Sequence, residues 1–155
     1  MTYPYNKKRH KQLVKRSLDL KNQGKSLLFE NRAEDFELSK YNSAVREQVY
    51  WAHRDKFLKI TKNFLTGLIN FDEFDDTFSE LYNDVGIEYN LFRNDLEQIE
   101  KFQPSTRPNS FASLMTRFFR MLDAAEDDYM TEQEVTSRIK EHCLTYQIFE
   151  DEVDI

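Results

Sequence analysis

The chain has 155 residues and a mass of 18.7 kDa, which is the size of one ordinary domain and argues against a two-domain enzyme. Hydrophobic residues make up 39% of it, and no apolar run is long enough to cross a bilayer, so we expect no membrane insertion. Its 22 aromatic residues are too many for a disordered chain. Three glycines and three prolines are too few for the many tight turns of a β architecture, and we therefore expect an all-α fold.

The first half of the sequence predicts two helices. The first runs from about residue 7 to residue 30, and Gly24 weakens its middle. Residues 31–41 are polar and are expected to form a connection. A long helix is then expected over residues 42–68, because Asn42 and Ser43 are good N-caps and the apolar residues that follow recur at helical steps.

Two further helices are expected in the centre of the chain. Asn70, followed by Glu73, resembles a capping box that opens a helix over residues 71–85. Gly86 is expected to end that helix. Apolar residues at helical spacing then predict another helix over residues 88–102.

The last part of the chain predicts a helix in two pieces. Residues 103–109 contain two prolines and indicate a loop, after which helical periodicity extends over residues 110–146. Thr131 and Glu134 have the spacing of a capping box, which starts the second piece. The acidic tail, residues 150–155, is expected to fray.

Together these elements predict a compact antiparallel four-helix bundle with an extra basic N-terminal helix. We expect a basic extension and linker over residues 1–41, an acidic helical bundle over residues 42–149, and a tail over residues 150–155.

Charge is strongly segregated along the chain. The first 25 residues contain eight bases and one acid, Asp19, although the net charge of the whole chain is -6. We expect such an arm to fold back onto its own body or to stay solvated. The alternatives are that it binds anionic lipid or that it binds the phosphates of a nucleic acid. In the last case, deletion of residues 1–25 should abolish RNA binding and leave the fold intact. The candidate nucleic-acid residues are Lys7, Lys8, Arg9, Lys11, Lys15 and Arg16.

Acidic residues gather in the body. Residues 72–100 contain ten acids and one base, and residues 123–155 contain eleven acids and two bases. Such segments repel nucleic acid and attract a strongly basic protein surface, although they also serve solubility. We expect the partner-binding carboxylates on the helix face opposite the phenylalanines of residues 71–78. These residues, called the acidic face below, are Asp72, Asp75, Asp76 and Glu80.

No catalytic, metal or cofactor site is expected. His10, His53 and His142 are scattered, and no pair of them has the spacing of metal ligands on one helical face. Cys143 is expected to be a small core residue, since its neighbour His142 points about 100° away on a helix. The single cysteine and the lack of an export signal favour a cytoplasmic location, or the interior of an organelle.

Several motifs between residues 57 and 147 resemble a known family. They are the segments 64–69 (FLTGLI), 71–78 (FDEFDDTF), 95–97 (DLE) and 127–135 (DDYMTEQEV). In these segments the chain resembles the bacterial self-protective colicin-like immunity proteins of the colicin D immunity type. The resemblance implies a four-helix bundle whose acidic surface occupies the basic active site of a tRNA-cleaving toxin. Roughly the first 40 residues have no counterpart in it.

Three functions follow from these observations. The leading hypothesis is a non-enzymatic protein-binding module, an immunity-type inhibitor that blocks a basic nuclease domain with its acidic face. The alternative is an RNA- or ribosome-associated accessory or assembly factor that uses the basic arm. A third is a helical assembly factor in which Trp51 and nearby aromatic residues meet a partner helix, although a buried core suits those residues better.

Overall fold

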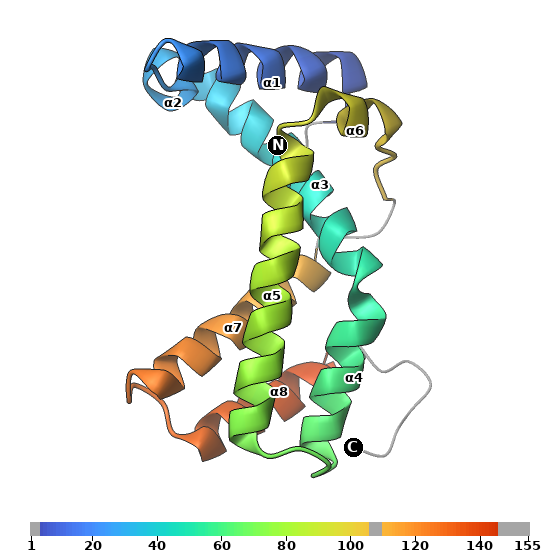
Figure 1. Ribbon diagram of the computed structural model, residues 1–155, viewed down its shortest axis with the longest axis vertical. Helices are drawn as coiled ribbons and strands as arrows, with labels where there is room; N and C mark the ends of the chain where they lie inside the picture. The colour runs from blue at the N-terminus through green and yellow to red at the C-terminus, as the bar shows by residue number, and fades with distance from the viewer. Residues whose placement is uncertain (1–3, 106–109, 146–155) are drawn as a thin grey trace. The chain divides into compact units, whose positions relative to one another are not determined.

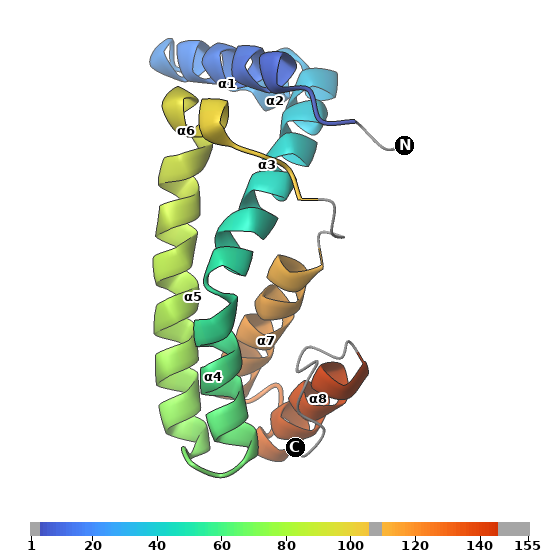
Figure 2. The ribbon, with the colours of Figure 1, turned by 90° about the vertical axis from the view of Figure 1, so that its right-hand side faces the viewer.

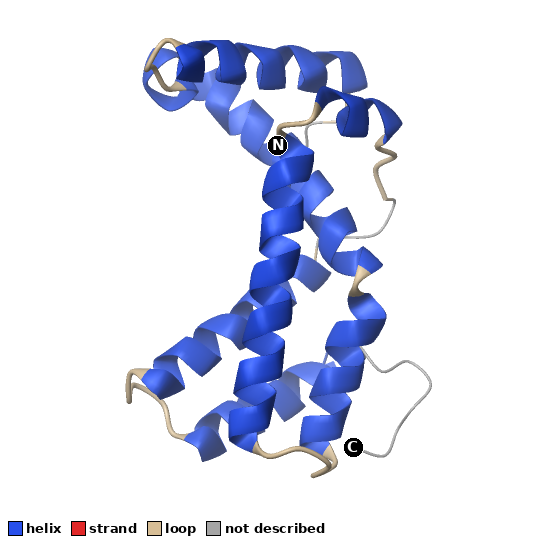
Figure 3. Cartoon of the chain, in the orientation of Figure 1, coloured by secondary structure: helices blue, strands red, loops and turns tan. Residues whose placement is uncertain are grey.

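The computed structural model describes residues 4–105 and 110–145, and within these ranges the chain consists of helices joined by loops and turns, with no strand (Figure 1 and Figure 3). The predicted all-α fold is confirmed. None of the described helices is both long and apolar enough to span a membrane. The helices are α1 (Lys7–Asn22), α2 (Leu27–Glu30), α3 (Arg32–Ala52), α4 (Arg54–Leu65), α5 (Phe71–Arg93), α6 (Leu96–Lys101), α7 (Phe111–Glu126) and α8 (Glu132–Thr145).

The helices form two compact units. Unit 1 comprises residues 1–50 and 86–110, and unit 2 comprises residues 51–85 and 111–155. This division does not coincide with the predicted boundary between residues 41 and 42, since residues on both sides of that position belong to unit 1.

In unit 1, α6 lies alongside α1 in both Figure 1 and Figure 2. A buried apolar cluster joins α1, α2, α3 and α6, and its members are Leu13, Val14, Leu27, Leu38, Tyr41 and Ile99. Because α1 supplies two of these residues, the N-terminal segment belongs to the core of unit 1 and is not a removable arm. The expectation that residues 1–25 can be deleted without harm to the fold is therefore wrong.

In unit 2, phenylalanine side chains are prominent in the core between α4, α5 and α7. Phe64 stacks on Phe74 with ring centroids 4.4 Å apart, and Phe78 contacts both Phe57, at 5.4 Å, and Phe118, at 6.1 Å. From α8, three side chains complete this core, namely Val135, Ile139 and Cys143. The apolar periodicity of these helices thus maps onto buried faces, as predicted.

The first helix is shorter than predicted, because Gly24 ends it. Gly24 has a φ of 71°, in the left-handed region, and follows the C-cap of α1. The amide of Lys25 donates to the carbonyl of Leu20 at 2.8 Å, and the amide of Gly24 donates to that of Lys21 at 3.0 Å. This pair of bonds is a Schellman motif, which a glycine at that position favours. The segment to residue 30 is the separate short helix α2.

The predicted connection over residues 31–41 is wrong, since these residues belong to α3. Asn31 caps that helix through its side-chain oxygen, which accepts from the amide of Glu34 at 3.1 Å. The predicted caps, Asn42 and Ser43, lie inside the helix. The predicted helix over residues 42–68 is also interrupted at His53, where α3 gives way to α4. Periodicity did not reveal this break, because apolar residues on both sides of His53 keep helical spacing.

Gly86 does not end a helix, contrary to the prediction, and α5 continues through it to Arg93. A β-carbon at Gly86 would lie 3.5 Å from the hydroxyl oxygen of Tyr50, in ordinary contact. The predicted helix over residues 88–102 is therefore replaced by the end of α5 and the short α6. Asp95 starts α6, since its carboxylate accepts from the amides of Glu97 and Gln98.

Two of the predicted capping residues, Asn70 and Thr131, are confirmed. Asn70 accepts from the amide of Glu73 at 2.9 Å, and Thr131 accepts from the amide of Glu134 at 3.1 Å. The Thr131 hydroxyl also donates to the Glu134 carboxylate at 3.3 Å. The centre of the predicted proline loop, residues 106–109, and the predicted fraying tail lie outside the described residues.

Candidate functional site

The acidic face lies on α5 within unit 2. Asp72, Asp76 and Glu80 follow one another at intervals of four residues and are all exposed. A spacing of four places them in one row along the helix. Phe74 and Phe78, on the opposite side, are 0% exposed. None of the three carboxylates makes an ion pair or hydrogen bond with a described residue, so their charge faces solvent.

Asp75 differs from the other three members of the acidic face. It is half-buried, and its carboxylate accepts a hydrogen bond of 3.0 Å from the Ser79 hydroxyl. Burial, together with the negative charges of Asp76, Asp123 and Asp72, raises the pKa of Asp75. The influence of Asp123, at the end of α7, shows that a second helix contributes to the acidic potential of this face. Sequence distance hid this contribution, because 48 residues separate the two aspartates.

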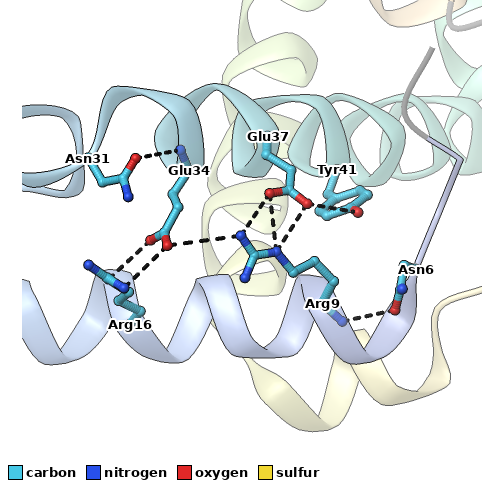
Figure 4. A network of polar contacts seen from close by, with 7 residues as sticks. All are labelled: Asn6, Arg9, Arg16, Asn31, Glu34, Glu37 and Tyr41. Carbon is cyan, nitrogen blue, oxygen red and sulfur yellow. Dashed lines mark hydrogen bonds and ion pairs between the residues drawn. The ribbon is translucent and has the colours of Figure 1, made fainter. Parts of the chain in front are cut away.

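The two arginines of the predicted arm are bound to α3 (Figure 4). Arg9 donates from Nε and Nη2 to the carboxylate of Glu37 at 3.0–3.1 Å, and its Nη2 lies 3.9 Å from Glu34. Arg16 pairs with Glu34, with Nε and Oε2 3.0 Å apart. The Arg9 guanidinium lowers the pKa of Glu37. This part of the arm therefore folds back onto its own body, and its charge is compensated there.

The four lysines of the predicted arm lie elsewhere on α1. They line a groove of about 650 Å³ beside α6, called the lysine groove below. Lys7 donates to the backbone carbonyl of Glu100 at 2.6 Å, and Lys11 donates to the Glu100 carboxylate at 2.5 Å. Lys8 and Lys15 are exposed and have no partner among the described residues. The lining residues are Lys7, Lys8, Lys11, Gln12, Lys15, Leu96 and Glu100.

The buried face of α1 contains a histidine, His10, to which the sequence analysis gave no role. His10 is 0% exposed and packs against the rings of Tyr5 and Tyr41, with centroids 5.6 and 5.2 Å away. His10 Nδ1 and the Tyr5 hydroxyl share a hydrogen bond of 3.0 Å, while Nε2 has no hydrogen-bond partner among the described residues. Burial lowers the pKa of His10 to about 4, and Asn42 offsets this effect in part. The ring is neutral at pH 7.

Cys143 is buried, as predicted, and burial raises the pKa of its thiol to about 12. Within residues 4–105 and 110–145, no group of three or more histidine, cysteine, aspartate or glutamate side chains is placed to hold a metal ion.

The two units differ in charge. Unit 1 contains 14 bases and 10 acids, a net charge of +4, whereas unit 2 contains 8 bases and 18 acids, a net charge of -10. The segregation seen along the sequence is therefore a segregation between compact units. Unit 1 attracts anionic partners at long range and unit 2 attracts cationic ones.

Comparisons with known protein families, with curated proteins and with solved structures find no match to this chain. The functional proposals therefore rest on the residues, contacts and charges described above.

Proposed function

We propose that this chain is a non-enzymatic protein-binding module whose acidic face binds a basic protein surface. One observation carries the proposal, namely the contrast between paired and unpaired carboxylates. Glu34 and Glu37 of unit 1 are bound to arginines, whereas Asp72, Asp76 and Glu80 of unit 2 form an exposed row without an ion-pair partner in the part of the chain that the structure describes. Such a row attracts a basic partner and accelerates its association.

In its most concrete form, the partner is the basic nuclease domain of a tRNA-cleaving toxin, and the chain is an immunity-type inhibitor. The resemblance of residues 57–147 to colicin-like immunity proteins and the net charge of -10 on unit 2 support this form. A row of carboxylates on a helix presents negative charges to a site that otherwise binds phosphates. Inhibition then requires only that the acidic face cover the nuclease site, and no catalytic group in this chain.

The test uses a purified tRNA-cleaving nuclease domain of the colicin D type, with its association rate measured at several salt concentrations. The variants replace only carboxylates, each by the amide of the same size. The variant Asp72→Asn, Asp76→Asn, Glu80→Gln should associate at least about tenfold more slowly at low salt and inhibit tRNA cleavage less. The matched control is Asp128→Asn, Glu132→Gln, Glu141→Gln, which removes three exposed charges of unit 2 that lie outside α5.

Equal losses in the variant and in its control would show that net charge, and not the acidic face, drives association. Failure of the unaltered chain to inhibit the nuclease domain would reject the immunity-type form. The wider proposal would then be tested against basic peptides of increasing length, and binding that the acidic-face variant does not weaken would reject it as well.

A further inference from the structure

We propose that the lysine groove of unit 1 binds single-stranded RNA through its phosphates, independently of the acidic face. α1 divides its bases between two sides. Arg9 and Arg16, seven residues apart, point to α3 and are paired with glutamates (Figure 4). Lys7, Lys11 and Lys15 follow at intervals of four, which forms a second row on the groove side.

The groove keeps a clear excess of positive charge. Its described lining contains four lysines and one carboxylate, that of Glu100, which Lys11 already binds. Lys8 and Lys15 remain without a partner among the described residues. Unit 1 as a whole has a net charge of +4, so the long-range field has the same sign as the groove.

The placement of these lysines is unfavourable for α1 itself. The positive end of a helix dipole lies at the N-terminus, where acidic residues stabilise and basic residues destabilise. The first turn of α1 has no acidic residue and begins with Lys7 and Lys8. Departures from a local rule of this kind are expected where a surface serves binding.

The shape and spacing of the groove favour a nucleic-acid strand. Lysines four residues apart on a helix lie about 6 Å apart along its axis, a regular repeat that suits a backbone with one charge in every nucleotide. A concave surface suits a strand better than the plane of a membrane. Gln12, which also lines the groove, has an amide that both donates and accepts, and a ribose 2′-hydroxyl does the same. We therefore assign the groove to RNA.

The test measures the affinity of the full-length protein for a fluorescent oligouridine of 12 nucleotides over a series of salt concentrations. Each phosphate contact with a single strand contributes about 0.7 to the logarithmic salt slope. The variant Lys8→Gln, Lys15→Gln should therefore lower the slope by about 1.4 and weaken binding at least about tenfold at low salt. Glu100→Gln should strengthen binding, since it removes the carboxylate from the groove.

The matched control is Lys56→Gln, Lys59→Gln, which removes two exposed lysines of α4 in unit 2 and should leave RNA binding unchanged. The acidic-face variant should also bind RNA as the unaltered chain does, which separates this proposal from the proposed function. Circular dichroism checks that every variant is folded.

Three results would overturn the proposal. One is equal weakening by the α4 control and the groove variant. Another is competition by polyglutamate or by vesicles of anionic lipid as strong as that by unlabelled oligouridine. The third is an affinity for oligodeoxyuridine equal to that for oligouridine, which would overturn the assignment to RNA.

Discussion

Arg9 in α1 holds the carboxylate of Glu37 in α3 with two nitrogens, at 3.0–3.1 Å, and thereby ties the N-terminal helix to the body of unit 1. The Arg9 side chain is 36% exposed and that of Glu37 is 19% exposed, so solvent screens the pair in part. Because two nitrogens of the guanidinium donate to one carboxylate, this pair is stronger than an ordinary surface ion pair.

Arg9→Gln should therefore lower the free energy of unfolding by about 1 kcal/mol at pH 7. The folded-state pKa of Glu37 is lowered, so the stabilisation is present above the unfolded pKa of a glutamate, about 4.3, and is lost as the pH falls through the folded value. Urea denaturation of the unaltered protein and of Arg9→Gln, at pH 7 and in acid, measures this difference in the free energy of unfolding. A difference between them that does not shrink in acid would contradict the ion-pair explanation, and Lys8→Gln is the control without a partner.

His10 should make the stability depend on pH in a range above that of Glu37. Its pKa is lowered to about 4 by burial, so the unfolded chain binds a proton that the folded chain does not between pH 6.5 and 4. As the pH is lowered from 6.5 to 4, the free energy of unfolding should fall by about 1.4 kcal/mol for each pH unit, or about 3 kcal/mol in all. His10→Gln should flatten this part of the curve. An NMR titration that places the pKa of His10 near 6.5 would refute the prediction.

Two glycines should respond in opposite ways to alanine. Gly24 has a φ of 71°, so Gly24→Ala should destabilise the protein by about 1 kcal/mol. Gly86 lies within α5, and its new β-carbon would make only an ordinary contact with Tyr50, so Gly86→Ala should stabilise by up to about 1 kcal/mol. Thermal and urea denaturation compare the two variants. Destabilisation at both sites would mean that α5 has no room at Gly86.

Cys143 should be inert in the folded protein. Its side chain is buried and the pKa of its thiol is raised to about 12, so almost no thiolate forms at pH 8. Reaction with a disulfide reagent at pH 8 should be slow in buffer and rapid in denaturant. Equal rates in both solvents would place the thiol at the surface.

Helical class, buried faces and caps could be predicted from the sequence, because each depends on residues close together in the chain. Asn70 and Thr131 cap helices as their spacing indicated, and Phe74 and Phe78 are buried on the face opposite the carboxylates. The boundaries that failed depend on contacts over longer distances or on backbone geometry. The continuation of α5 through Gly86 is one example, since glycine occurs both at helix ends and inside helices and does not by itself distinguish the two.

The roles of the basic residues depended on tertiary structure. Arg9 and Lys8 are adjacent in sequence and equally basic, yet one is paired with Glu37 and the other is exposed at the groove. The partners of Arg9 and Lys11 come from helices further along the chain, since Glu37 lies 28 residues after Arg9 and Glu100 lies 89 residues after Lys11. No local pattern encodes such separations. The burial of His10 between Tyr5 and Tyr41 has the same origin.

The pairing of α1 with α6 also constrains the order of folding. Lys11 and Glu100 are 89 residues apart, and the cluster of Leu13 and Val14 includes Ile99. Closing so long a loop costs entropy before any contact repays it, which slows folding. During synthesis, α1 is made before α6 and stays without this partner until α6 has followed it. The lysine-bearing helix therefore exists for a time without the element that forms the other side of its groove.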